Sequence, residues 1–488
     1  MSDQGESGAG GLTGLVQGLV DAIVRLYRWL YKGLERTVYM GVQYTYPRRF
    51  VTPLGYLGVL TGITFLVLGI TGGLLMIYYQ PTLTGCGSLT CAFASIERIN
   101  DSVPFGWLIR NIHYTASNAM VLLAVLHMYY QYFSGRFKIK NEVLWVTGVI
   151  LGIITGVEAY SGYDLLFNQR AGLAIEIGSS LANASPIIGG TLRLSVFGAG
   201  FSDFVLRLYA GHVFILPMIM LILVFWHFPR YLVFDLPVIS TVVGGLFVIA
   251  AIFPVAYQPG PYNPGNGQIT IPEWYITGIY ALIRTEFDKF VMGGLMPALL
   301  FLMALVVPFV DTSKKLNWKD RPFFTAIGIT SIAQIVITTA WGFYVNPNPN
   351  PTCVVNGAAT SGTLCRLFVD PVLYFSSMLG VTLLSFVGTY AFLRYLKAKE
   401  RVRRATSPLG PLLTKKWVYI TFTLLILAQV ALAGLALLSI FGFHQVVGNV
   451  TIDIAGGLKS MTLFDTGAIL VTFGVVVHLY RYSQSLPF

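Results

Sequence analysis

The chain has 488 residues, of which 55% are hydrophobic and 11% are charged, and its net charge is +11. No soluble domain needs so large an apolar share, so the composition excludes a soluble enzyme or binding module and predicts an all-α protein that crosses a membrane several times. The basic excess requires no nucleic-acid partner, because attraction to anionic membrane lipid accounts for it.

The first region, residues 1–45, precedes the hydrophobic segments. Residues 12–36 alternate apolar and basic side chains at helical spacing. This pattern predicts an amphipathic helix on the membrane surface. The segment lacks the n-region and cleavage site of a signal peptide, so we expect it to stay in the protein.

Ten later segments are apolar and long enough to cross a membrane as helices. They are residues 56–79, 113–134, 142–161, 204–228, 236–257, 292–310, 323–345, 369–393, 417–443 and 463–482. A cytoplasmic N-terminus places most of the 32 Lys and Arg residues on the inner side. The positive-inside rule therefore favours that orientation.

The four cysteines fall in two loops that this topology places outside. Cys86 and Cys91 lie in the first outer loop, and Cys353 and Cys365 lie between the seventh and eighth segments. Outer loops are compatible with disulfides. Two local disulfides, four unpaired thiols and a cross-loop pairing remain open, whereas metal binding is disfavoured because neither loop contains a histidine.

Four of the six histidines form two pairs in apolar segments. His113 and His127 are 14 residues apart, and His212 and His227 are 15 apart. At about 100° and 1.5 Å per residue, each pair stays near one helix face with roughly 21–22 Å between its members. Two such helices can hold two hemes, one near each side of the membrane. Ligation by two imidazoles closes both axial positions of the iron, which suits electron transfer.

Glycines repeat the same interval in two neighbouring segments. Gly58 and Gly72 are 14 apart, as are Gly148 and Gly162. Glycines at this interval share a helix face and leave room for a flat macrocycle. Close helix packing is the alternative explanation of each glycine pair taken alone.

Together with these residues, further motifs resemble cytochrome b, the membrane core of quinol-oxidising bc complexes. The resemblance runs from Tyr46 to Lys319 and more weakly to residue 396. Its sharpest element is the quartet Pro272–Tyr275 (PEWY), which resembles the family's signature at the outer quinol-oxidation site.

The resemblance implies two b-type hemes and gives several residues a role in binding them. In the predicted topology the outer heme iron lies between His113 and His212, and the inner heme iron between His127 and His227. Arginines so placed before the histidines meet heme propionates in the family; here they are Arg110 and Arg207.

At the outer site the resemblance implies that Glu273 accepts a proton from quinol. A carboxylate beside an apolar stretch is costly unless it is paired or used. Trp274 and Tyr275 would shape the pocket beside Pro272. The alternatives are a hydrogen bond that anchors the loop and aromatic packing at the membrane interface. Glu158, near the outer end of the third segment, is a second candidate proton group.

An inner quinone site is less clearly marked. Arg230 follows His227 by three residues, and Asp235 begins the fifth segment. The pair would protonate reduced quinone, but an ordinary inner-face arginine and a helix-capping aspartate explain it equally well. His444 and His478 have no partner at equal depth and are expected to be structural.

Details favour the chloroplast and bacterial subfamily, to which the 15-residue histidine interval is similar. Tyr56 stands where that subfamily has a cysteine that holds an additional heme, so that heme is not expected. Leu166 and Phe167 replace the usual Pro-Trp, so the shape of the quinol pocket is not carried over. The chain is also continuous after the fourth segment and adds two C-terminal segments.

The resemblance implies the diheme subunit of a respiratory complex in a prokaryotic plasma membrane. Outer quinol oxidation would pass one electron to a Rieske-type iron–sulfur protein, and onward to a cytochrome c-like carrier or terminal oxidase. The other electron would reach quinone at the inner side, with proton translocation. A homodimer is expected by resemblance. The regions would be 1–45, a diheme four-helix bundle at 46–232, quinol-site helices at 233–400 and two extra helices at 401–488.

Two other functions fit part of the pattern. A heme-b anchor that links a dehydrogenase to the quinone pool needs four histidines but has no use for Pro272–Tyr275. A transporter with a histidine proton relay fits ten spans but predicts no tightly bound heme.

Overall fold

The computed structural model describes most of the chain after residue 56. The described residues are 17–18, 20–22, 24–25, 57–138, 142–227, 236–255, 260–265, 269–285, 287–355, 358–400, 415–447, 450–454 and 456–485. Those between 12 and 36 are helical, and the rest of the predicted surface helix lies outside the described residues. Arg230, Asp235 and Tyr56 also lie outside them.

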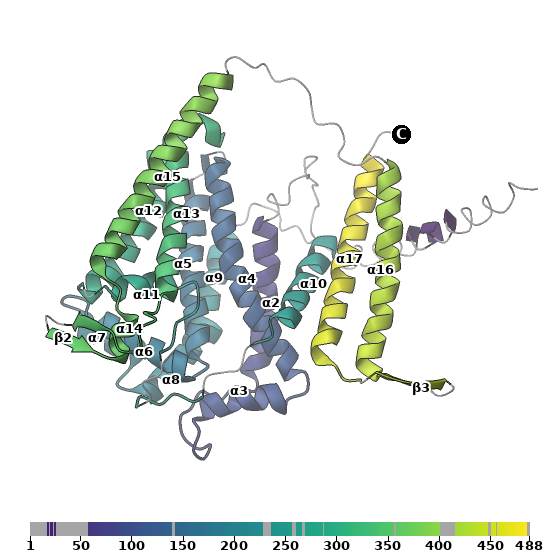
Figure 1. The fold of residues 1–488 in the computed structure, drawn as a ribbon, viewed down its shortest axis with the longest axis horizontal. Coiled ribbons are helices and arrows are strands. Elements are labelled where there is room, and N and C mark those ends of the chain that lie inside the picture. The colour runs from purple at the N-terminus through teal and green to yellow at the C-terminus, as the bar shows by residue number, and fades with distance from the viewer. Residues whose placement is uncertain are drawn as a thin grey trace, which may run out of the picture.

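Long helices side by side form the body of the protein (Figure 1). They are α2 (Leu57–Met76), α4 (Gly106–Phe133), α5 (Glu142–Asp164), α8 (Phe201–Ala210) continued by η3 (Gly211–Ile215) and α9 (Leu216–His227), α10 (Leu236–Ile252), η4 (Val291–Leu295) continued by α12 (Met296–Val310), α13 (Pro322–Phe343), α15 (Pro371–Glu400), α16 (Lys415–Phe441) and α17 (Lys459–Ser485).

These helices correspond to the ten predicted segments. Eight are long and apolar enough to cross a membrane, α10 is a shorter apolar helix, and α4 has 28 residues. The prediction of an all-α membrane protein is thus confirmed. The start of α4 was placed too late, because the helix begins at Gly106 rather than at residue 113.

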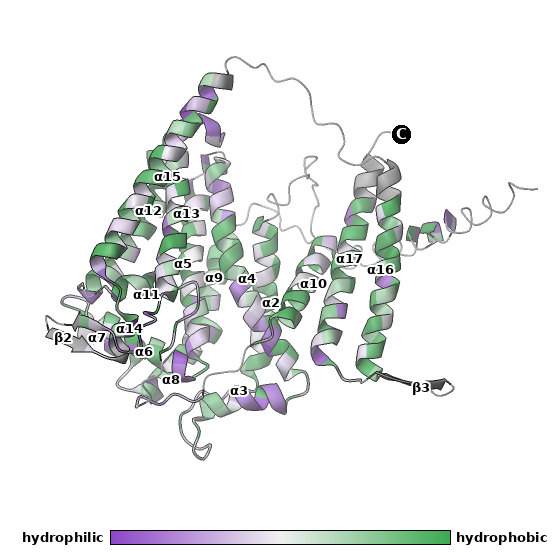
Figure 2. Ribbon diagram, in the orientation of Figure 1, coloured by the Kyte–Doolittle hydropathy of each residue, from purple (hydrophilic) through white to green (hydrophobic). Residues whose placement is uncertain are grey.

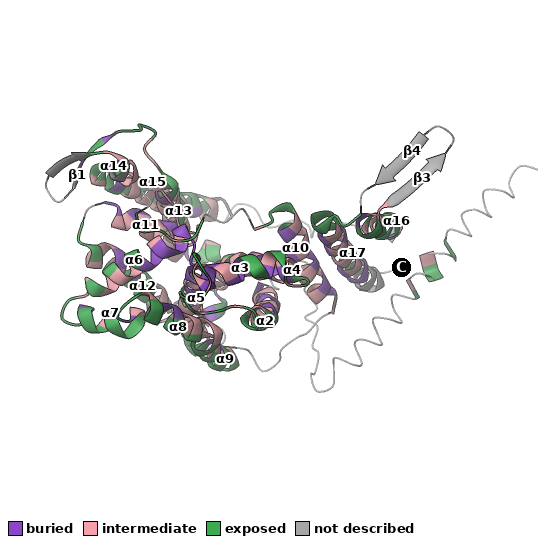
Figure 3. Ribbon diagram, turned by 90° about the horizontal axis from the view of Figure 1, so that it is seen from below, coloured by how far each residue is buried: buried purple, intermediate pink, exposed green. Residues whose placement is uncertain are grey.

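The exposed surface of the long helices is strongly apolar (Figure 2). Phe225 on α9 is 81% exposed and Leu384 on α15 is 79% exposed. Buried residues occur instead on parts of helices such as α5 and α11 (Thr277–Ile283), as the colouring in the view from below shows (Figure 3). Contiguous exposed apolar surface on this scale is expected only where lipid or another subunit covers it.

Short elements gather at the lower end of the bundle in Figure 1. They are α3 (Cys91–Asp101), α6 (Gln169–Asn183), α7 (Gly189–Phe197), α14 (Thr363–Leu367) and the antiparallel hairpins β1 (Thr352–Val355) with β2 (Ala358–Ser361) and β3 (Phe443–Val447) with β4 (Val450–Ile454). Two disulfides lie here: Cys86 is joined to Cys91, and Cys353 to Cys365.

A buried carboxylate ties the other end of the bundle together. Asp311, which follows α12, is almost fully buried and accepts from Lys138 at 2.5 Å and from Arg321 at 2.5 Å. Arg321 also donates to the main-chain oxygen of Tyr132 at 2.8 Å. The ends of α4, α12 and α13 are therefore held to one charged centre.

The two C-terminal helices attach to the bundle through α10, beside which they stand in Figure 1. A Cβ atom on Gly244 would lie 2.6 Å from the main-chain oxygen of Gly467, and one on Gly467 would lie 2.7 Å from that of Gly244. Ser240 donates to the main-chain oxygen of Leu470 at 2.6 Å. Small residues thus bring the backbones of α10 and α17 together, which is a common way for helices to associate in lipid.

Candidate functional site

The four paired histidines meet across the bundle at two levels. His113 of α4 faces His212 of η3 with ring centroids 6.4 Å apart and planes at 81°. His127 of α4 faces His227 of α9 with centroids 6.3 Å apart and planes at 86°. Two metal–nitrogen bonds of about 2 Å each, plus the half-width of each ring, span about 6 Å. Each pair is therefore spaced for one metal atom between its rings.

The metal-ligating side chains at each histidine pair are too few for a bare ion and favour a metal that is already held by a cofactor. Within the described ranges, no three or more His, Cys, Asp and Glu side chains group together as a bare ion would require. Two imidazoles on opposite sides are the axial ligands of a heme, whose macrocycle supplies the remaining four. The residues present thus fit two b-type hemes.

A glycine lies against each histidine ring. A Cβ atom on the glycine would approach the Cε1 atom of the imidazole closely in every case: Gly58 to His127 at 3.0 Å, Gly72 to His113 at 3.1 Å, Gly148 to His227 at 2.7 Å and Gly162 to His212 at 2.6 Å. The sequence interpretation assigned this space to the macrocycle. The structure shows that the glycines first make room for the imidazoles themselves.

Three of the glycines follow a hydroxyl residue that faces the same histidine. Nδ1 of His113 lies 2.9 Å from the Thr71 hydroxyl, Nδ1 of His227 lies 3.2 Å from Thr147, and Nδ1 of His212 lies 3.0 Å from Ser161. Sequence reasoning missed these three residues. The signal was a Thr or Ser directly before the glycine.

The hydrogen bonds of these hydroxyls determine the imidazole tautomer. Thr71 donates to Val67 O at 2.7 Å, Thr147 to Val143 O at 2.7 Å and Ser161 to Glu158 O at 2.9 Å. Because the single hydroxyl hydrogen is used there, the oxygen accepts from the histidine Nδ1–H. The other ring nitrogen, Nε2, is then left with its lone pair for a metal.

A π turn explains how the 15-residue histidine interval works. His212 lies in η3 (Gly211–Ile215), between the α-helical stretches α8 and α9. A π turn accommodates one extra residue without disturbing the helix on either side, and such turns are frequent at functional sites. His212 and His227 are therefore related as if 14 residues apart, which matches the spacing of His113 and His127.

The predicted propionate arginines are held by neighbouring elements. Arg110 is buried in α4 and donates to Asn100 of α3 at 2.9 Å. Arg207 of α8 donates to the main-chain oxygens of Ser195, at 2.8 Å, and Leu194 in α7. Their contact with heme propionates stays a prediction.

The quartet Pro272–Tyr275 is fastened to three helices just before α11. Glu273 accepts from Arg170 of α6 at 2.6 Å, with the Glu273 side chain 11% and the Arg170 side chain 35% exposed. Trp274 donates to Asn118 of α4 at 2.8 Å, and Tyr275 donates to Ala159 O of α5 at 3.1 Å. These three contacts anchor the loop, and the contact of Glu273 is compatible with the loop-anchoring role that was its alternative. Arg170 was not identified from the sequence.

A second carboxylate lies near Tyr275. Burial raises the pKa of the Tyr275 hydroxyl, and the charges of Glu273 and Asp164 raise it further. Asp164, at the end of α5, is fully buried, and within the described part of the chain neither of its carboxylate oxygens has a partner at hydrogen-bonding geometry. The neighbouring Tyr160 hydroxyl donates instead to Ala174 O at 2.9 Å. Tyr275 therefore stays neutral and acts as a hydrogen-bond donor.

Glu158 lies against the pair of His113 and His212. Its main-chain oxygen and its Oε1 atom are each 3.2 Å from Nδ1 of His212. Its Oε2 atom is buried and has no hydrogen-bond partner in the described ranges. The residue predicted as a proton group is thus also an acceptor for a candidate heme ligand. His444 lies on β3 and His478 on α17.

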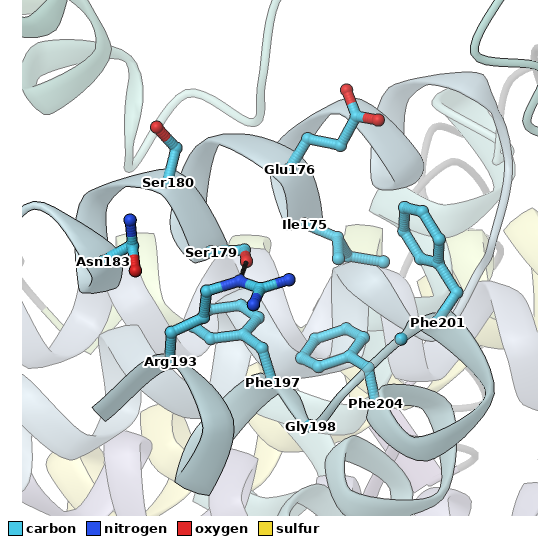
Figure 4. Close-up of a pocket in the computed structure, with 11 residues that line it drawn as sticks. Ile175, Glu176, Ser179, Ser180, Asn183, Arg193, Phe197, Gly198, Phe201 and Phe204 are labelled. Carbon is cyan, nitrogen blue, oxygen red and sulfur yellow. Dashed lines mark hydrogen bonds between the residues drawn. The ribbon is translucent and has the colours of Figure 1, made fainter. Parts of the chain in front are cut away.

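A pocket of about 390 Å³ opens between α6, α7 and α8 (Figure 4). Arg193 points into it and donates to Ser179 at 3.1 Å, and Phe197 stacks on Phe204 with centroids 5.0 Å apart. None of Pro272–Tyr275 lines this pocket, so it is separate from the quartet.

Two family models of known proteins match the chain. The family model for cytochrome b/b6/petB matches residues 44–232, and that for cytochrome b(C-terminal)/b6/petD matches residues 266–361. The first match contains all four paired histidines, and the second contains the quartet.

Individual relatives match over large parts of their length. The chain is 35% identical over 207 residues to cytochrome b6 of a Cyanothece species, covering 42% of this chain and 90% of that protein. It is 29% identical over 322 residues to the cytochrome bc complex cytochrome b subunit of Chlorobaculum thiosulfatiphilum, covering 58% of this chain and 72% of that one. A solved hyperthermophilic respiratory Complex III covers 69% of this chain and 93% of its own, at 23% identity and a TM-score of 0.49.

Proposed function

Because the chain belongs to the cytochrome b family, we propose that it is the diheme subunit of a respiratory bc-type complex and oxidises quinol at the outer membrane face. The observation that carries the proposal is the two facing histidine pairs, each ring lying against a glycine. A structural role for these histidines would explain neither the equal spacing of the pairs nor the four glycines.

The outer heme would be held by His113 and His212 and the inner heme by His127 and His227. When bound, the hemes supply one-electron transfer between the two sides of the membrane. The chain holds three of the imidazoles in one tautomer and packs all four against a glycine of a neighbouring helix. Arg110 and Arg207 lie on α4 and α8 shortly before His113 and His212, where they would bind the propionates.

Quinol would be oxidised beside Glu273, which takes up a proton. A carboxylate has two oxygens, so the pair with Arg170 leaves acceptor capacity for a quinol hydroxyl. Tyr275 and Trp274 fix the loop on α5 and α4 and thereby fix the position of Glu273. Released protons would leave on the outer side, while an inner quinone near Arg230 and Asp235 would take up protons, so proton translocation follows.

The first electron acceptor would be a separate Rieske-type iron–sulfur protein. The chain has four cysteines, and all four are joined in disulfides. None is left to ligate an iron–sulfur cluster, which needs cysteine thiolates. We place the protein, by resemblance, in a prokaryotic plasma membrane as a homodimer with a cytoplasmic N-terminus, next to a cytochrome c-like carrier or terminal oxidase.

Quinol oxidation by the purified complex tests the function. Glu273→Gln should slow turnover strongly while both hemes stay bound, because the proton acceptor is lost but the ligands are not. Glu97→Gln, an exposed change on α3, is the matched control and should leave turnover unchanged. Full turnover in Glu273→Gln would favour the heme-b anchor instead, and a preparation without heme would favour the transporter.

A further inference from the structure

The four histidines differ in what faces their Nδ1 atoms. Three face a hydroxyl that directly precedes a glycine, as described above. The fourth, His127, packs against Gly58, and the residue before Gly58 is Leu57. Among the residues that the structure describes, the buried Nδ1 of His127 has no hydrogen-bond partner.

The contrast is sharpest within α2, because position 57 repeats position 71. Gly58 and Gly72 approach His127 and His113 at nearly the same distance, 3.0 and 3.1 Å. The preceding residue therefore stands in the same relation to its histidine in both cases. At position 71 it offers a hydroxyl oxygen, and at position 57 it offers only a hydrocarbon side chain.

The difference separates the two proposed hemes. Both ligands of the outer heme have acceptors at Nδ1: Thr71 for His113, and Ser161 with Glu158 for His212. In the inner pair, the described residues provide none for His127. An acceptor at Nδ1 makes an imidazole a stronger electron donor to its metal. A more basic ligand stabilises ferric iron and lowers the midpoint potential.

We propose that the residue before each glycine tunes the midpoint potential of the heme whose histidine packs against that glycine. Leu57 thus raises the midpoint potential of the inner heme, because it offers His127 no hydrogen-bond acceptor. Leu57 is a positioning residue in this sense, since it acts through the histidine. The inference rests on the proposed ligation of two hemes. Its consequence is that electron transfer from the outer to the inner heme is more favourable than it would be with four equal ligands.

Leu57→Thr restores the missing hydroxyl, and Leu57→Val is its control because valine has the same branched shape without the oxygen. We expect Leu57→Thr to lower the inner-heme midpoint potential relative to Leu57→Val, with the outer heme unchanged. A tenfold change in the ferric-to-ferrous equilibrium corresponds to about 59 mV for a one-electron couple. Redox titration of the purified complex, followed in the heme absorption bands, measures the shift.

A second substitution tests the same idea in the opposite direction. Thr71→Val removes the acceptor of His113 and should raise the outer-heme potential. Thr64→Val is its control, because Thr64 is a buried threonine of α2 whose hydroxyl donates to Leu60 O at 2.8 Å, within its own helix. If Leu57→Thr fails to assemble, the comparison of Thr71→Val with Thr64→Val tests the proposal by itself.

The outcomes separate the inference from the proposed function. A wild-type protein without two bis-imidazole hemes contradicts the proposed ligation itself. Two hemes whose potentials are the same in the Thr and Val variants at position 57, and the same in the two variants of Thr71 and Thr64, contradict only the tuning by the residue before the glycine.

Discussion

The guanidinium of Arg170 lies 2.6 Å from the carboxylate of Glu273. The contact joins the start of α6 to the quartet that precedes α11, and it brings a positive charge to the proposed quinol site. Any proton acceptor function of Glu273 therefore operates within an ion pair.

Arg170→Met should impair quinol oxidation without loss of heme. The substitution leaves Glu273 without its partner and frees its side chain to turn away. We expect kcat/KM to fall about tenfold, which corresponds to about 1.4 kcal/mol of transition-state stabilisation. Arg170→Lys should recover part of the loss, because lysine keeps the charge but not the planar donor geometry. Steady-state quinol oxidation measures both variants, and wild-type kcat/KM in Arg170→Met would show that the ion pair has no part in turnover.

Alanine at two glycines of α5 should remove one heme each. A Cβ atom at Gly162 would lie 2.6 Å from His212, and one at Gly148 would lie 2.7 Å from His227. Neither contact fits without moving the ring, so Gly162→Ala should lose the outer heme and Gly148→Ala the inner heme. Reduced-minus-oxidised spectra report each loss.

Gly156 provides the control in the same helix, since a Cβ atom there meets nothing within 4 Å. Gly156→Ala should keep both hemes. Equal spectra in all three alanine variants would contradict the close approach of the rings.

Asp311→Ala should destabilise the protein more than any surface charge change. Asp311 is almost fully buried between Lys138 and Arg321, and its removal leaves both cations without their partner. Breaking a buried pair costs about 3–5 kcal/mol. Asp320→Ala is the comparison, because the exposed Asp320–Lys397 pair at 3.4 Å is worth about 1 kcal/mol or less. Thermal unfolding of the detergent-solubilised protein should show a larger loss of stability for Asp311→Ala than for Asp320→Ala. Equal stability of the two variants would show that the ion pairs of Asp311 do not stabilise the protein.

Tyr275→Phe should slow quinol oxidation without changing its pH profile. The substitution loses a hydrogen bond to Ala159 O, worth about 1 kcal/mol. The pKa of Tyr275 is raised by burial and by the two nearby carboxylates, so the hydroxyl is neutral below that raised pKa and contributes no titration at physiological pH. Turnover measured across pH should give parallel curves for the two proteins. A rise or fall of turnover with pH that is present only in the wild type would mean that the Tyr275 hydroxyl titrates.

Much of the architecture could be predicted from the sequence, because lipid imposes a simple rule on it. A segment that crosses the membrane must be helical and apolar, so hydropathy locates it. The start of α4 escaped this rule. Its first turns carry Arg110 and Asn111, which α3 and the chain near Val255 cover with hydrogen bonds. Such polar helix turns are invisible to a hydropathy pattern.

The intervals between the histidines and between the glycines also indicated the candidate site. Residues separated by a fixed interval along a helix have a fixed relative direction, so their shared face can be predicted. The contacts around the site did not follow from intervals. Arg170 and Glu273 are far apart in sequence and meet only through the packing of α6 against the loop before α11. The π turn at His212 likewise depends on main-chain hydrogen bonds, which the residue types there do not predict.

The heme content of the purified protein tests the central claim most directly. A pyridine hemochrome assay, set against the polypeptide concentration, should give two b-type hemes for each chain, and His227→Leu should reduce this to one. A colourless preparation, or a single heme per chain in the fully loaded wild type, would contradict the account.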